Sequence, residues 1–194
     1  MTQMKSNTLE AVSRTRSIAR PLALRILGIL GFIGLIAAGA HLKIAIGITP
    51  VPITLQTLFV VLAGALLGPA EGALAVAGYL ALGAFGIPLF AKAGAGTGLA
   101  YFSGVTGGYL AGFFLAAIFV GFAVRRATKI GWQTAAFFGG SFIILAFGTL
   151  WLKVVLDVSI AKAAMMGYVP FIIGDIVKTS VAVVIYRSTR RLQR

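Results

Sequence analysis

The chain has 194 residues, of which 59% are hydrophobic and 11% charged, and its 17 Lys and Arg against 4 Asp and Glu give a net charge of +13. A soluble domain carries about 25% charged residues, so this composition excludes an ordinary water-soluble fold and indicates an integral membrane protein. The length suits about six helices of roughly 20 residues. Because the basic residues stand at the edges of apolar runs, they do not indicate nucleic-acid binding.

The N-terminus has two interpretations. Residues 1–20 are polar and basic and are expected to form a separate segment, either disordered or flat on the membrane surface, before an apolar run from Leu22 to Lys43. This layout, with the small residues 38–40 near the end of the apolar run, is also that of a secretory signal peptide. The polar lead is long, however, and apolar character continues through Ile48. We therefore expect an uncleaved first transmembrane helix.

Prolines shape the segment that follows. Pro50 and Pro52 push the residues before them away from helical geometry, so residues 48–52 are predicted to be extended. A second helix is expected over about 53–67 and a third over about 70–85, joined by a tight turn at 68–72. Glu71 lies at the start of the third helix, where its charge stabilises the positive end of the helix dipole.

Residues 86–106 form a long Gly-rich connection with few charges. It is too apolar for a solvated linker, so we expect a lid or re-entrant segment buried in protein. Lys92 is then either a solvated loop tip or a hydrogen-bond donor on that lid.

Three further helices are predicted, over 107–124, 133–152 and 169–187, and residues 153–168 suit a short surface helix. With six helices, twelve basic residues fall on the side of the two termini and four on the other, while Lys178 lies within the membrane. The positive-inside rule then places both termini in the cytoplasm. We expect an all-α, six-helix domain over 21–190 with a basic tail at 191–194, in a bacterial inner membrane.

Glycines recur at four-residue spacing at 64, 68 and 72 and again at 104, 108 and 112. In lipid this spacing allows close backbone approach, which serves either packing inside the bundle or docking of a partner helix. Gly34 and Ala38 repeat the spacing in the first helix and are also a candidate docking face.

The signals for an enzyme are weak. Of the four acidic residues, only Asp175 lies inside a predicted span, so paired carboxylates for acid–base catalysis are lacking. The lone histidine, His41, is expected to be an interfacial side chain. We find no metal-ligand spacing and no nucleotide-binding motif, so we expect no cofactor, and any ATP-driven motor must reside on another subunit.

Asp175 and Lys178 are the strongest functional candidates. They stand three residues apart on one face of the last predicted helix, and ionisable residues inside a membrane span are costly and mark functional sites by default. One interpretation is a structural pair that holds the helix in the bundle. The other is a cavity open to the outer side, in which Asp175 accepts ligand N–H groups and Lys178 donates to a ligand carbonyl or carboxylate.

Other polar and aromatic residues could complete such a cavity. Thr54, Gln56 and Thr57 cluster at the start of the second helix, either as local or interfacial groups or as a second polar wall. Aromatic walls or interfacial anchors are the alternatives for Tyr79, Phe90, Tyr101 and Tyr109.

Several blocks together resemble one family. They are Pro50–Thr57, Leu67–Pro69, Gly86–Ala91, Thr106–Phe113 and Gly174–Lys178. In this order, over most of the chain, they are similar to the BioY family of biotin transporters, the substrate-binding S components of energy-coupling factor transporters.

The resemblance implies six helices that capture biotin from outside and work with a transmembrane coupling subunit and two cytoplasmic ATPases, toppling in the membrane to release the substrate. It implies that Asp175 and Lys178 contact biotin. The chain departs from the family pattern at Val105, where proline is usual, and its only asparagine is Asn7, far from the lid. An S component for thiamine or riboflavin, an intramembrane enzyme acting on a lipid, and a purely structural bundle are the alternatives.

Overall fold

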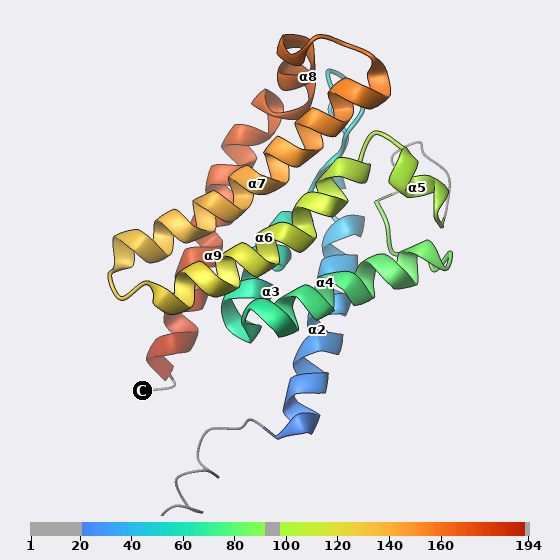
Figure 1. The fold of residues 1–194 in the computed structure, drawn as a ribbon. Coiled ribbons are helices and arrows are strands. Elements are labelled where there is room, and N and C mark those ends of the chain that lie inside the picture. The colour runs from blue at the N-terminus through green and yellow to red at the C-terminus, as the bar shows by residue number, and fades with distance from the viewer. Residues whose placement is uncertain (1–20, 92–97, 193–194) are drawn as a thin grey trace, which may run out of the picture.

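A computed structural model describes residues 21–91 and 98–192, and most of these residues are helical (Figure 1). Lys92, residues 1–20 and the end of the C-terminal tail, for which predictions were made above, lie outside the described residues. The helices are α2 (Leu22–His41), α3 (Gln56–Leu67), α4 (Pro69–Ala84), α5 (Ala100–Ser103), α6 (Gly107–Arg126), α7 (Ile130–Leu156), α8 (Ile160–Gly167) and α9 (Ile172–Leu192).

Within residues 21–91 and 98–192, four helical segments are long and apolar enough to cross a membrane: α2, α6, α7 and the stretch Ile160–Leu192 that contains α8 and α9. Helices α3 and α4 are shorter, with 12 and 16 residues. At 1.5 Å per residue they measure about 18 and 24 Å. The helical membrane fold is thus confirmed, with two helices shorter than a full span.

A small β-hairpin departs from the expected all-α fold. Strand β1 (Lys43–Ile44) pairs antiparallel with β2 (Ile53–Thr54), so the second helix begins at Gln56 and not at Ile53. The physical reason lies in Pro50 and Pro52, which keep the chain extended at the point where it turns back along itself. Thr54 consequently lies on a strand that leads into α3.

Other helix ends also differ from the prediction. Helix α7 continues to Leu156, and a short 3₁₀ helix, η1 (Val169–Phe171), stands before α9. Pro170 disfavours α-helical geometry at Val169, and the regular helix starts at Ile172. The expected surface helix within 153–168 is present as α8.

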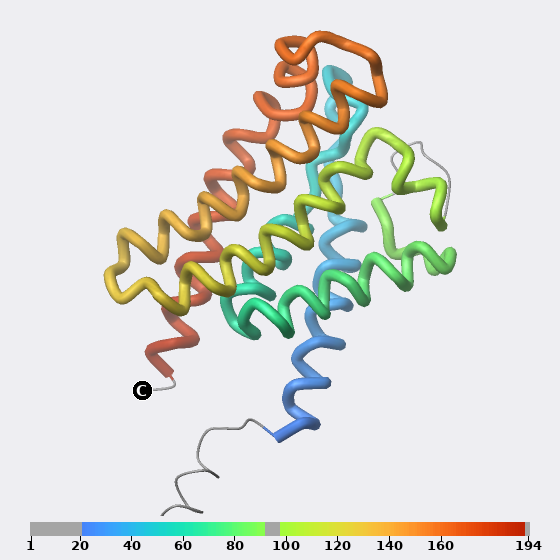
Figure 2. Tube along the Cα trace, viewed as in Figure 1, coloured from blue at the N-terminus to red at the C-terminus, as the bar shows by residue number. Residues whose placement is uncertain are grey.

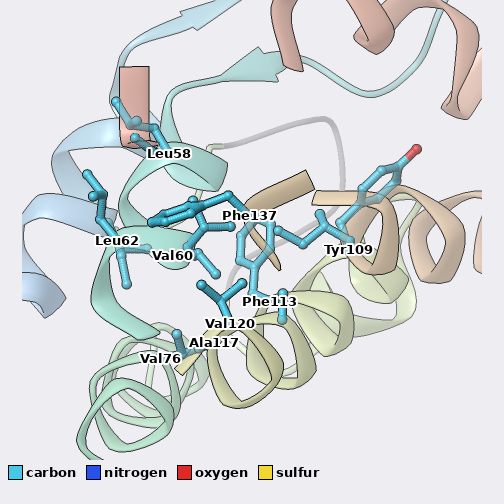
Figure 3. Packing of buried hydrophobic residues seen from close by; sticks show 14 of the residues in the cluster. Leu58, Val60, Leu62, Val76, Tyr109, Phe113, Ala117, Val120 and Phe137 are labelled. Carbon is cyan, nitrogen blue, oxygen red and sulfur yellow. The ribbon is translucent and has the colours of Figure 1, made fainter. Parts of the chain in front are cut away.

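The core lies where α3, α6, α7 and α9 meet, and α4 packs against α3 and α6 (Figures 1, 2 and 3). Helices α6 and α7 run side by side because glycines remove side chains from their contact: a Cβ on Gly112 would lie 2.9 Å from the Ile144 Cα. Gly64 of α3 likewise meets the Ala117 backbone of α6. These glycines therefore serve packing within the bundle.

The turn between α3 and α4 depends on Gly68, whose φ of 100° lies in the region that favours glycine. The Arg125 guanidinium donates to the Leu67 carbonyl over 2.8 Å, which satisfies a carbonyl at the end of α3. Glu71 lies in the first turn of α4 and pairs with Arg25 of α2 at 2.6 Å.

Candidate functional site

A cavity lies between the segment 51–57 and helices α6, α7 and α9. Five of the predicted site residues line it together, although they are distant in sequence: Gln56, Thr57, Tyr109, Asp175 and Lys178. The other lining residues include Thr54, Thr106, Tyr101, Phe113 and Phe171. The cavity is therefore apolar and aromatic for most of its wall, with its polar groups gathered at α3 and α9.

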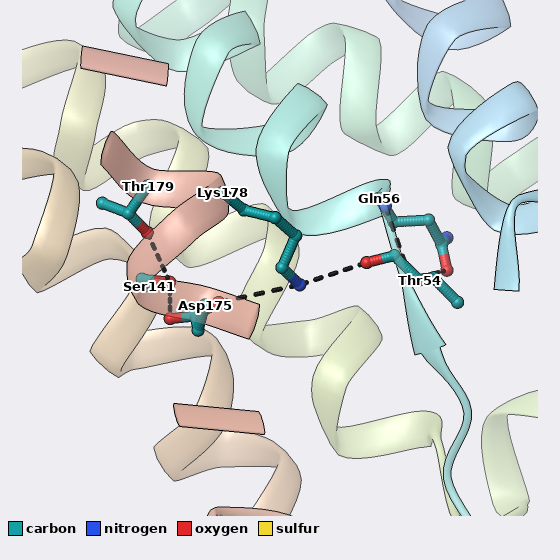
Figure 4. Close-up of polar contacts among 6 residues, drawn as sticks. All are labelled: Thr54, Gln56, Ser141, Asp175, Lys178 and Thr179. Atoms are coloured by element: carbon teal, nitrogen blue, oxygen red, sulfur yellow. Dashed lines mark hydrogen bonds and ion pairs between the residues drawn. The ribbon is translucent and has the colours of Figure 1, made fainter. Parts of the chain in front are cut away.

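Two hydroxyl groups, from α7 and α9, hold the Asp175 carboxylate in place (Figure 4). The Ser141 hydroxyl of α7 donates to Oδ2 of Asp175, and the Thr179 hydroxyl, one turn further along α9, donates to Ser141 over 3.3 Å. Only 7% of Asp175 is exposed. This chain of hydroxyls fixes the carboxylate, and its other oxygen, Oδ1, lies 3.8 Å from Nζ of Lys178, which also lines the cavity.

Lys178 reaches across to the hairpin. Its ammonium donates to the Thr54 carbonyl over 3.1 Å and stands near Asp175 (Figure 4). Thr54 and Lys178 thus connect β2 with α9. An ammonium has three donors, so it can exchange the carbonyl of Thr54 for a ligand oxygen and remain beside Asp175.

Gln56 stands at the start of α3 and is 5% exposed. Its Oε1 accepts from the Thr54 hydroxyl over 3.2 Å, and its Nε2 donates to the Tyr79 hydroxyl over 2.6 Å. Tyr79 therefore lies behind Gln56 and not in the cavity wall. The Thr54 hydroxyl also accepts from the Gln56 backbone N–H over 3.4 Å. Its bonds are therefore local, as one interpretation expected, although Thr54 lies on β2 and not within the helix.

The aromatic residues form two groups. Phe90 stacks on Tyr101 with ring centroids 4.5 Å apart and meets Tyr79 edge-on at 5.4 Å. Of these three, only Tyr101 lines the cavity. On the opposite wall, the Tyr109 hydroxyl donates to the Gly167 carbonyl over 2.5 Å, so its ring, and not its hydroxyl, is free to contact a ligand.

Two buried hydroxyls of the wall, Thr57 Oγ1 and Thr106 Oγ1, have no hydrogen-bond partner among the described residues. An unsatisfied buried polar group costs about 1–3 kcal/mol. Such groups are retained where a ligand or ordered water satisfies them. A third such hydroxyl among the described residues, Thr149 Oγ1, does not line the cavity.

The sequence analysis missed Ser141, Thr179 and Thr106. A signal existed for the first two: Ser141 is the only serine within the predicted helix 133–152, and Thr179 stands four residues after Asp175, on the same helical face. Thr106 was treated only as part of a motif. Within the described ranges, no three His, Cys, Asp or Glu side chains come together as a metal site.

Comparison with known proteins identifies the family. The model of the BioY family matches residues 6–194. The chain belongs to the BioY family. This confirms the resemblance inferred from the Pro50–Thr57 and Gly174–Lys178 blocks.

The BioY relatives cover most of the chain. The biotin transporter BioY of Thermotoga maritima is 40% identical over 162 residues, which span 84% of this chain and 93% of that protein. The biotin transporter BioY of Rhizobium etli is 37% identical, over 79% of this chain and 86% of its own length. A crystal structure of the S component for biotin from an ECF-type ABC transporter superposes with a TM-score of 0.79 at 26% identity, covering 89% of this chain and 95% of that one.

Proposed function

We propose that this protein takes up biotin as the substrate-binding membrane component of an energy-coupling factor transporter. The observation that carries the proposal is the buried Asp175–Lys178 pair in the wall of an apolar cavity, in a chain of the BioY family. The function is transport, not catalysis, since the relatives are biotin transporters.

The chemistry of biotin matches the cavity. Its ureido ring offers two N–H donors and one carbonyl, and its side chain ends in a carboxylate. Asp175, an acceptor held by Ser141, suits the ureido N–H groups, and Lys178 suits an oxygen of the ligand. The rings of Tyr101, Tyr109 and Phe171 provide apolar surface for the fused rings.

Gln56, Thr57 and Thr106 form the opposite polar wall. The hydroxyls of Thr57 and Thr106 have acceptor and donor capacity that the described residues leave unused. A ligand with several polar atoms satisfies them and removes the cost of leaving buried hydroxyls unpaired. Tyr79 and Phe90, which stand behind Gln56 and Tyr101, support the wall without touching the ligand.

The connection 86–106 serves as the lid. Its described first part is fastened to the end of α2 and to β1: His41 Nε2 lies 3.1 Å from the Pro88 carbonyl, and Lys43 donates to the Ala91 carbonyl over 2.9 Å. Ala91 itself lines the cavity. Release of these two contacts frees the described residues 88–91 from the end of α2 and from β1, and Lys92, the next residue in sequence, lies outside the described residues.

We also infer six spans with both termini in the cytoplasm of a bacterial cell. Helix α3 is buried along most of its length, and a helix enclosed by protein can be shorter than a full membrane span. Most basic residues at helix ends fall on the side of the termini.

The transmembrane coupling subunit docks on α2, and two cytoplasmic ATPases drive transport. Gly34 and Ala38 are exposed on α2, and a Cβ added at Gly34 meets nothing within 4 Å. This small-residue face is therefore available to another helix, whereas Gly64 and Gly112 are used inside the bundle.

The test is uptake of labelled biotin by cells without a biotin transporter that express this chain, with and without coupling and ATPase subunits. We expect saturable uptake that unlabelled biotin competes away and that thiamine and riboflavin leave unchanged. Absence of uptake under both conditions, or competition by thiamine, contradicts the assignment.

A further inference from the structure

A basic hollow lies at the end of the bundle opposite the hairpin. It is bordered by the turn between α6 and α7 and by the last turns of α9, which lie close together in Figure 1. Counted to its mouth, the hollow measures about 640 Å³, and its wall is mainly polar, including Thr128, Gln133, Tyr186, Arg187, Arg190 and Arg191. It is separate from the cavity at Asp175.

The three arginines of the hollow have no anionic partner among the described residues. Among the described residues, the two ion pairs are Arg25 with Glu71 and Lys178 with Asp175. The remaining described carboxylate, Asp157, ends α7 at the far end of that helix from the hollow. Uncompensated guanidinium groups gathered around a concave surface favour an anion.

The hollow is also partly preorganised. The Arg190 guanidinium lies over the Tyr186 ring at 5.9 Å, which restricts its position. Gln133 donates to the Ala127 carbonyl over 3.1 Å and closes the turn that forms the other side of the wall. The Arg190 guanidinium, placed in this way, offers paired N–H donors that match the oxygens of a phosphate.

An apolar groove continues from the hollow. It lies between α6 and α7, measures about 900 Å³ to its open side, and shares Thr128 with the hollow; its wall includes Phe119, Ala123, Trp132 and Ala136. Trp132 is 69% exposed, as is usual for tryptophan at the boundary between lipid and water. Arg126 stands at this groove with its guanidinium 5.7 Å from the Phe122 ring.

We propose that the basic hollow binds the phosphate of an acidic phospholipid, whose acyl chain lies in the adjoining apolar groove. The apolar groove favours a lipid over other anions. An acidic protein surface or a free phosphate would contact the arginines but would leave the apolar groove beside them unfilled. Basic pockets between membrane helices are known to bind acidic lipid head groups. The proposal does not depend on biotin transport.

The test is native mass spectrometry of the full chain in neutral detergent with equal amounts of phosphatidylglycerol and phosphatidylcholine of the same acyl chains. The R190Q/R191Q variant removes two charges from the hollow. The matched control, K153Q/K162Q, removes two exposed charges from α7 and α8 at the other end. We expect a preference for phosphatidylglycerol on the order of 10-fold in the wild type and the control, and nearly none in R190Q/R191Q.

Two wild-type measurements keep the test independent of how the variant folds. Higher salt should reduce the preference, because exposed charges are screened. Inorganic phosphate and glycerol phosphate, added as competitors, should displace the lipid far less effectively than phosphatidylglycerol itself. Equal retention of both lipids by the wild type, an equal loss in both double variants, or full displacement by inorganic phosphate overturns the proposal.

Discussion

Asp175→Asn is the substitution that most sharply separates a ligand-binding carboxylate from a structural one. The amide has nearly the same shape, and its carbonyl can still accept from Ser141, so the bundle is expected to fold. What is lost is the negative charge that faces the cavity beside Lys178. Biotin then loses a charge-assisted acceptor for its ureido N–H groups.

The expected loss of affinity follows from the burial of the site. Asp175 is 7% exposed and so interacts with a ligand with little competition from water. A hydrogen bond to a charged group contributes about 1.5–3 kcal/mol, more than a neutral one. At about 1.4 kcal/mol per factor of ten, biotin affinity should fall roughly 10- to 150-fold.

Calorimetric titration of detergent-purified protein measures the change. The matched control is Asp157→Asn, which makes the same chemical change at an exposed position that ends α7. Asp157 has φ 50°, a conformation that asparagine tolerates well, so affinity there should equal that of the wild type. Unchanged affinity in folded Asp175→Asn protein refutes the reasoning.

Three further predictions concern the wall and the bundle. Thr106→Val should weaken biotin binding by about 0.5–1.5 kcal/mol in a titration. The melting temperature of the ligand-free protein should not fall, because the Thr106 hydroxyl has no partner within the protein's described residues. A lower melting temperature would indicate a structural role. Gly64→Ala should destabilise the protein by about 1–3 kcal/mol because the added Cβ meets the α6 backbone. The control, Gly34→Ala, should leave the midpoint of thermal unfolding unchanged or raise it. Equal effects of the two substitutions would contradict the close contact between α3 and α6. Arg125→Gln should lower thermal stability by about 1–3 kcal/mol through the Leu67 carbonyl, and an unchanged midpoint would count against this cap.

The sequence predicted the helical order because apolar runs and prolines are local signals. The sequence also predicted that Asp175 and Lys178 share one helical face, because residues three apart on a helix are neighbours whatever the tertiary structure. The β-hairpin was not predicted: the prolines indicated an extended segment, but pairing of Lys43 with Thr54 depends on how the chain turns between them.

The candidate site was predictable only in part. Charge in an apolar span identified Asp175, whereas a threonine inside a Gly-rich motif carries no comparable signal, so Thr106 was missed. Tyr79 was expected in the wall, but the structure places it behind Gln56. Its hydroxyl accepts from the Gln56 amide and does not line the cavity. Such distinctions depend on helix rotation and depth, which residue type does not determine.

The central claim is that the cavity beside Asp175 binds biotin. A calorimetric titration of the purified wild-type chain with biotin tests this claim most directly. The account predicts one saturating biotin per chain, with affinity unaffected by excess thiamine or riboflavin. A titration without saturable heat, from protein shown to be folded, would contradict it.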